Sequence, residues 1–278
     1  MKTLKKIMTF SVLIGAFAVM VSCDKEDDTG TNEPVNFSAE NSVFAAKADN
    51  AIEGSLLIIE NAYDENEGPD RMTNPISLFT ACATIDFNPN GDGTGIIVLD
   101  FGDGCTLNNG ATVAGKVNIS YGAIANNERV INYTFENYTY NNNGVEGGGE
   151  IVRELENANG NPASTVNETI VVTFPSSTVT ATRVGLRIAE WVEGVGSGIW
   201  TDNVYHITGN WETTLSNGFV RTGTVTETLV RELSCAYLVE GVLEVSQDGL
   251  TGTLDFGEGA CDNNAVFTFN GIAFPITL

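Results

Sequence analysis

Carboxylate side chains next to tryptophans are the residues of this sequence that could carry out chemistry on a sugar. Glu190 and Glu193 lie beside Trp191, and Glu212 follows Trp211. Glycoside hydrolases use a pair of carboxylates, one as the acid and the other as the base or nucleophile. Acidic residues are common throughout this chain, so their nearness to tryptophan in the sequence is weak evidence for catalysis. A carboxylate-based glycoside hydrolase is therefore a less favoured hypothesis than binding, and we name no catalytic residue.

Histidine chemistry has little support. The chain has one histidine, His206, in a polar and aromatic stretch. Catalytic triads built on histidine, and zinc sites with the usual His and Cys ligands, need more such residues than the sequence offers.

A partial calcium loop is the one metal-binding pattern in the sequence. Asp86, Asn88 and Asn90 supply oxygens at its first, third and fifth positions, and a glycine follows. Pro89 lies within the pattern, and Ile97 stands where the loop requires a bidentate glutamate. A plain hairpin turn is the favoured interpretation, and calcium is the only cofactor considered.

Aromatic side chains could support a binding role. Trp191, Trp200, Trp211, Tyr138 and Tyr140 could form a platform for sugar rings on a sheet face, with asparagines and acids as hydrogen-bond partners. The alternative is that they fill the core, as Trp and Tyr commonly do. Exposed tryptophans would favour a ligand-binding module, with a glycan as ligand. Buried ones would favour a structural or accessory envelope protein without a small-molecule ligand.

The net charge limits the classes of partner. The chain has a formal net charge of -23, and removal of residues 1–22, which contain three lysines, would change it to -26. A chain this acidic is repelled by nucleic-acid phosphates and by anionic lipid head groups. Nucleic acid is therefore excluded as an expected partner.

The start of the chain predicts export. Residues 1–22 combine three lysines with an apolar run from Ile7 to Val21 and a small residue before Cys23, which is typical of a secretory signal peptide. The stretch Met20-Val21-Ser22-Cys23 resembles the lipobox of bacterial lipoproteins, which implies lipidation of Cys23. The acidic run from residue 24 to 28 resembles the surface-export signal of Bacteroidetes lipoproteins. We expect residues 23–38 to be the lipidated cysteine and a flexible acidic tether.

Residues 39–278 are predicted to form a single, mainly β domain. Apolar residues between Glu40 and Tyr63 recur every three or four positions, with Lys47, Asp49, Glu53 and others opposite, which favours an amphipathic helix on the β core, although EGSLLIIE could also be a strand. After Tyr63 the pattern has period two, with Gly and Asn turns. We expect an antiparallel β-sandwich or a strongly curved β-sheet with one N-terminal amphipathic helix.

Two cysteine cassettes, 82–105 and 235–261, frame the strands. Each begins with Cys-Ala and ends in a similar phrase, LDFGDGC or LDFGEGAC. Numbering across the two predicted hairpins sets Cys82 opposite residue 103 and Cys235 opposite residue 262. Facing residues on paired strands lie roughly 4.5 to 5.5 Å apart, within reach of a disulfide. Among three connectivities, Cys82 with Cys105 and Cys235 with Cys261 is the natural pairing.

Two further segments echo each other between the cassettes. Each reads as strand, asparagine-glycine turn and strand, and ends in VREL, at residues 152–155 and 230–233. The order of cassette, hairpin, hairpin and cassette hints at internal pseudo-symmetry.

Several runs together resemble a family of uncharacterised lipoproteins from Bacteroidetes. They are LDFGDGC, VINYTFENYTYNNNGVEG, AEWVEG with WTDNVYHITG, and LVRELSCAYLVEGVLEV through LDFGEGACDNNAVFTFNG. The resemblance covers about residues 40–278 and implies location and fold more than chemistry. It implies an outer-membrane protein held by a lipid anchor and displayed at the cell surface. The aromatic platform would make a polysaccharide the partner, and the structural alternative would make it another envelope protein.

Overall fold

The computed structural model describes residues 39–67, 77–247 and 249–278, all within the unit that Phe37–Leu278 form. The predicted signal peptide of residues 1–22, the predicted lipidation site Cys23, the predicted tether to residue 38 and Asp248 lie outside the described residues. Among the described residues, no helix is both long and apolar enough to cross a membrane.

One antiparallel sheet of fourteen strands makes up most of the described chain. Neighbours in the sheet are neighbours in sequence from β4 to β14; β3 pairs only with β4, beside β2. The strands are β1 (Thr84–Pro89), β2 (Gly95–Asp100), β3 (Cys105–Thr106), β4 (Thr112–Tyr121), β5 (Glu128–Tyr140), β6 (Asn143–Glu154), β7 (Ala163–Thr173), β8 (Thr180–Glu193), β9 (Val204–Leu215), β10 (Val220–Glu232), β11 (Glu240–Gln247), β12 (Leu250–Glu258), β13 (Asn264–Phe269) and β14 (Ile272–Thr277). The sheet is open, which confirms the mainly β prediction in its curved-sheet form.

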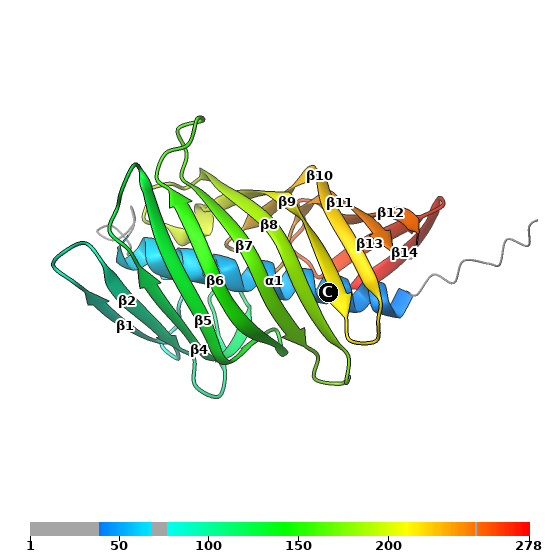
Figure 1. Ribbon diagram of the computed structural model, residues 1–278, viewed down its shortest axis with the longest axis horizontal. Coiled ribbons are helices and arrows are strands. Elements are labelled where there is room, and N and C mark those ends of the chain that lie inside the picture. The colour runs from blue at the N-terminus through cyan, green and yellow to red at the C-terminus, as the bar shows by residue number, and fades with distance from the viewer. Residues whose placement is uncertain (1–38, 68–76, 248) are drawn as a thin grey trace, which may run out of the picture. The chain divides into compact units, whose positions relative to one another are not determined.

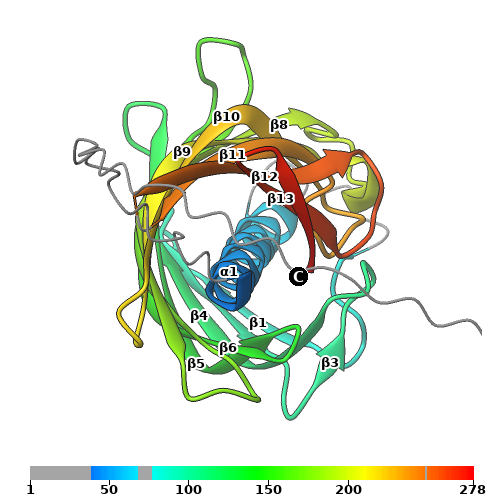
Figure 2. The same cartoon turned by 90° about the vertical axis from the view of Figure 1, so that its right-hand side faces the viewer.

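The helix α1 (Ala39–Asn66) lies in the hollow of this curved sheet. Figure 1 shows it crossing the strands, and Figure 2, which looks along it, shows the strands wrapped around it. It contacts β2, β5 to β9 and β14. The predicted helix is confirmed and is three residues longer at its end than the pattern indicated.

Burial of α1 extends around its whole circumference. Every residue from Ala48 to Asp64 is buried, on the acidic side as well as on the apolar one. The apolar side lies on the β core as expected, with Ile52, Leu56 and Ile59 completely buried. The acidic side faces the sheet too, which the sequence pattern alone did not indicate.

Side chains along each strand alternate between the two faces of the sheet, so every second one points toward the helix. In β4, for example, Val117, Ile119 and Tyr121 are buried, as the period-two pattern predicts. In β7, Val166 and Ile170 point inward in the same way, and Glu168 between them is also buried. The inner face therefore carries both the apolar core and charged groups.

The repeated LDFG phrase builds the same local structure twice. Asp100 accepts a hydrogen bond from the backbone N–H of Gly102 at 3.0 Å, and Asp255 accepts one from Gly257 at 2.8 Å. Both glycines have positive φ, at 58° and 98°, which a side chain would disfavour. The phenylalanine of each phrase is buried in the core. The phrase thus anchors an aromatic ring and bends the chain toward its cysteine.

The disulfides pair Cys82 with Cys105 and Cys235 with Cys261, so the predicted connectivity is confirmed. Thr84 pairs with Asp100, a register one residue off the predicted one. The first disulfide joins the segment before β1 to β3, and the second joins the loops that follow β10 and β12. Both therefore link segments at the ends of strands to one another covalently.

Gly54 gives the first prediction, because it lies where a side chain would collide with the sheet. A Cβ at position 54 would lie 2.1 Å from Cζ of Tyr140 on β5. In an exposed helix, alanine is about 1 kcal/mol better than glycine. Here we expect Gly54→Ala to lower the free energy of unfolding by about 1–3 kcal/mol, because the ring must move. Urea denaturation measures this, and a stabilised variant would show that α1 does not pack against β5 in this way.

Candidate functional site

Acidic side chains form one stripe along α1. Asp49, Glu53, Glu60, Asp64 and Glu67 recur at steps of three, four or seven residues, which places them on one helix face. The first four are at most 1% exposed. A carboxylate buried in this way requires opposite charge and hydrogen bonds. The inner face of the sheet supplies both.

Two arginines of β8 bind the middle of the stripe. Arg183 Nη2 and Arg187 Nε each donate to a different carboxylate oxygen of Glu53, both at 2.6 Å. Arg183 Nη1 also lies 3.4 Å from Asp49 Oδ1, and Arg187 Nη1 lies 3.3 Å from Glu60 Oε1. Burial acts to raise the pKa of Glu53, but the two guanidinium groups outweigh it and hold that pKa below its usual value.

Other strands bind the two ends of the stripe. The pairs are Asp49 with Arg221 of β10, Asp64 with Arg153 of β6 at 3.0 Å, and Glu67 with Arg129 of β5 at 3.3 Å. The order of the acids along the helix therefore follows the order of the strands in the sheet, from β10 through β8 and β6 to β5. We call these five acids and five arginines the acid–arginine ladder. It fixes the direction and the position of α1.

Aromatic rings complete the surroundings of the ladder. The guanidinium of Arg183 lies 4.0 Å from the ring centre of Trp211, and that of Arg153 lies 5.7 Å from Trp191. Such contacts stabilise a cation that has been removed from water. The ladder is therefore held by charge, hydrogen bonds and ring faces together.

Glu168 on β7 is a further carboxylate next to the ladder. It binds Nε of Arg183 through one oxygen, and its other oxygen is buried without a hydrogen-bond partner. Burial raises the pKa of Glu168 to about 7, and Arg183 offsets that effect only in part. This carboxyl therefore changes its charge near neutral pH.

A separate group of hydrogen bonds, outside the ladder, joins strands β5 and β10. Arg231 of β10 donates to the hydroxyl of Tyr140 on β5 at 2.9 Å and to the carbonyl of Ala236 at 3.1 Å. The Tyr140 hydroxyl donates to the same carbonyl at 2.7 Å. Arg153 and Arg231 are the arginines of the two VREL segments, so the repeated motif places an inward arginine in each hairpin.

The predicted aromatic platform is not on the surface. Trp191, Trp200, Trp211, Tyr138 and Tyr140 are all at most 5% exposed. Trp191 and Trp211 pack on ladder arginines, and Trp191 also packs on Tyr205. Tyr138 packs on Phe101 and Phe135, and Tyr140 binds Arg231. As ligand-facing residues these five are corrected to core residues.

Of the three carboxylates that lie near tryptophans in the sequence, Glu190 and Glu212 are far apart in the sheet. Glu190 is opposite His206 in the β8–β9 ladder, whereas Glu212 is opposite Val184. Six residues of strand separate these positions, roughly 20 Å, which exceeds the spacing that hydrolases use. Glu190 instead accepts hydrogen bonds from two asparagine side chains, at 2.9 Å each.

The weak calcium candidates lie on a hairpin. Asp86 and Asn88 are exposed positions of β1, paired opposite Val98 and Ile96. The side chain of Asn90 donates to Thr94 within the turn at 2.9 Å. Among the described residues, no group of three or more His, Cys, Asp and Glu side chains is placed to hold a metal ion.

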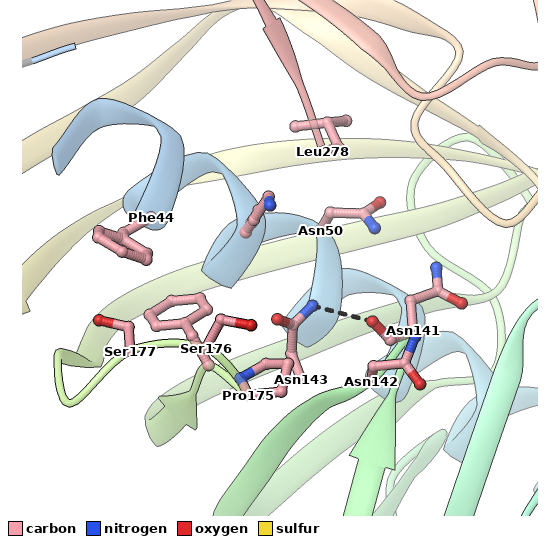
Figure 3. Close-up of a pocket in the computed structure, with 11 residues that line it drawn as sticks. Phe44, Asn50, Asn141, Asn142, Asn143, Pro175, Ser176, Ser177 and Leu278 are labelled. Carbon is pink, nitrogen blue, oxygen red and sulfur yellow. Dashed lines mark hydrogen bonds between the residues drawn. The ribbon is translucent and has the colours of Figure 1, made fainter. Parts of the chain in front are cut away.

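A pocket of about 320 Å³ lies beside the first half of α1. Residues from α1, from the turns after β5 and β7 and from the end of β14 line it (Figure 3). The lining residues are Phe44, Lys47, Asn50, Asn141, Asn142, Asn143, Phe174, Pro175, Ser176, Ser177 and Leu278. It is the candidate ligand site, and the sequence reasoning did not find it because its walls come from distant segments.

Two ring faces and several amides shape this pocket. Phe44 of α1 and Phe174 pack with ring centres 4.8 Å apart. Asn141 and Asn142 have φ of 47° and 64°, so they make the tight turn that brings their amides to the wall. Asn143 donates to the carbonyl of Asn141 at 3.3 Å, as Figure 3 shows. Apolar faces flanked by oriented polar groups are the usual make-up of a small-molecule site.

Comparisons with known protein families, with curated proteins and with solved structures found no match for this chain. The site is therefore interpreted from its own geometry.

The ladder gives the second prediction. Glu53→Gln leaves two buried guanidinium groups without their shared charge, so we expect the free energy of unfolding to fall by about 3 kcal/mol or more. The matched control is Glu40→Gln at the exposed start of α1, which should cost less than about 1 kcal/mol. Denaturant unfolding measures both. Equal effects of the two substitutions would contradict the proposed role of Glu53.

Glu168 gives the third prediction. With a folded pKa near 7 and an ordinary unfolded value, this carboxyl holds a proton in the folded state that the unfolded chain releases between about pH 4.5 and 7. Its contribution to stability therefore falls as pH rises through that window. As pH rises from about 5 to about 8, we expect the free energy of unfolding of Glu168→Gln to increase by about 3 kcal/mol relative to that of the wild type, because only the wild type loses this contribution. A difference that does not depend on pH would refute this.

Proposed function

We propose that the protein is a lipid-anchored lipoprotein of the outer membrane, displayed at the cell surface, whose β domain binds a ligand. The resemblance of residues 20–23 to a lipobox and the acidic run behind Cys23 support the anchor and the surface location. Two disulfides support an oxidising compartment, because such bonds are rare in reducing ones. Together these features favour an envelope protein.

The pocket beside α1 is the observation that carries the binding role. Its rings can cover the apolar face of a sugar, while amides and hydroxyls can bind the sugar oxygens. The proposed ligand is therefore a glycan, bound at this pocket and not at the buried tryptophans.

A structural or accessory envelope protein is the second candidate. Burial of Trp191, Trp200 and Trp211 favours it, because those side chains serve the core. In that case the outer surface of the sheet would contact another envelope protein and the pocket would have no ligand.

Lipidation gives the fourth prediction. In cells fed a clickable fatty acid, the full chain should be labelled and recovered with the membrane fraction. Cys23→Ser should abolish the label, and Cys82→Ser should not, because that thiol lies in the first disulfide. Labelling that survives Cys23→Ser would show that the anchor is elsewhere.

Glycan binding gives the fifth prediction. A ligand that binds the folded state raises the melting temperature, with about 2.7 kcal/mol of added stability at a hundredfold excess over Kd. We expect at least one member of a glycan panel to shift the melting point of the purified protein, with and without calcium. Asn143→Ala in the pocket should reduce the shift, and Asn210→Ala, an exposed amide on β9, should not.

Two results would count against this role. A flat panel would favour the structural candidate. An equal shift in both variants would place the ligand outside the pocket.

A further inference from the structure

Two asparagines of the pocket, Asn50 and Asn141, have side-chain oxygens that already accept hydrogen bonds. Asn50 is 3% exposed, and its carbonyl oxygen already accepts from Arg231 at 3.5 Å. The side-chain oxygen Oδ1 of Asn141 accepts a hydrogen bond from the backbone N–H of Thr112 at 3.0 Å. The side-chain nitrogen Nδ2 of Asn141 is buried without a hydrogen-bond partner. An asparagine amide nitrogen can only donate. These side chains therefore favour a ligand that brings acceptors.

The charge of the pocket differs from that of the rest of the molecule. No carboxylate side chain lines it, whereas Lys47 does. Among the described residues Lys47 and Lys116 are the lysines, and the arginines face the interior. Arg231 lies directly behind Asn50. In a chain with a net charge of -23, Lys47 and the amide donors are groups that attract negative charge, and they must outweigh the terminal carboxylate of Leu278, which also lines the pocket.

Long-range repulsion does not prevent an anion from binding here. At physiological ionic strength, charges more than about 8 Å apart are largely screened. The contacts within the pocket then decide, and an ammonium group with amide donors forms charge-assisted hydrogen bonds to a carboxylate. Phe44 is partly exposed and can contact the carbon skeleton of the ligand, while the buried Phe174 packs against its ring.

We propose that the pocket takes a sugar that carries a carboxylate, a uronic acid residue of a glycan. Lys47 binds the carboxylate, Asn50 donates to it or to a neighbouring hydroxyl, and the sugar ring lies against Phe44. This inference rests on the glycan-binding function proposed above and specifies its substrate class.

Titration calorimetry on the purified protein tests it with two matched pairs, glucuronate against glucose and galacturonate against galactose. We expect at least one acid to bind about tenfold or more tightly than its neutral counterpart. Raising NaCl from about 0.05 M to about 0.5 M should weaken the binding of the acid and leave that of the neutral sugar unchanged.

Three variants locate the effect. Lys47→Met should remove the preference for the acid, and the other described lysine gives the control, because Lys116→Met should keep it. Asn50→Asp retains an acceptor for Arg231 and so should keep the fold, while the added charge should weaken acid binding about tenfold or more. A melting curve of each variant shows that it is folded.

The outcomes separate the two proposals. Equal affinity for acid and neutral sugars overturns the inference and leaves glycan binding in place. A preference for the acid that persists in Lys47→Met also overturns it, because the carboxylate would then bind elsewhere. If no sugar binds, the proposed function fails together with the inference.

Discussion

The burial of four carboxylates on one face of α1, with Glu67 partly buried beyond them, is the constraint on which the rest of the structure depends. Such groups cannot leave water unless cations meet them at hydrogen-bonding distance. Arginines from β5, β6, β8 and β10 meet them, each at an inward position of its strand. The sheet must therefore curve around the helix, and its strands must stand in the order that the acids dictate.

This arrangement divides the charge of the molecule between inside and outside. The interior is balanced, because ladder acids and arginines pair, while the described exterior is acidic apart from two lysines. Buried ion pairs contribute more to specificity than to net stability. The acidic exterior repels anionic surfaces, which is compatible with the lipid anchor proposed above. The pocket beside Lys47 differs from this acidic exterior, because a lysine and no Asp or Glu side chain lines it.

Much of the local structure could be predicted from the sequence. The helix, the period-two strands and the disulfide pairing depend on residues near one another in sequence or across one hairpin, so pattern and spacing sufficed. The pattern separates Asp49 and Glu53 from the apolar side of the helix, but it does not indicate that this acidic side is buried. The partners of these acids could not be found in this way, because Arg183 and Arg187 lie more than a hundred residues away.

The errors have the same origin. Trp191 and Trp211 were assigned to a ligand platform because sequence does not tell which face of a strand packs on a distant arginine. The pocket is lined by α1 and by turns that lie far from it in the sequence, so no local motif predicts it. One usable signal was present: both VREL arginines fall at alternating inward positions beside buried apolar residues. An arginine at such a position requires polar partners inside the fold, and these are Asp64 for Arg153 and Tyr140 with the Ala236 carbonyl for Arg231.

Native-state hydrogen exchange is the most direct test of the central claim, that helix and sheet are one cooperative unit joined by the ladder. The backbone amides between Ile52 and Ile59 would be compared with those of β7 and β8. If the ladder holds α1 as described, these amides exchange only through global unfolding, with the same opening free energy as the strands. Exchange of the helix at a much lower free energy, while the sheet stays protected, would contradict the account.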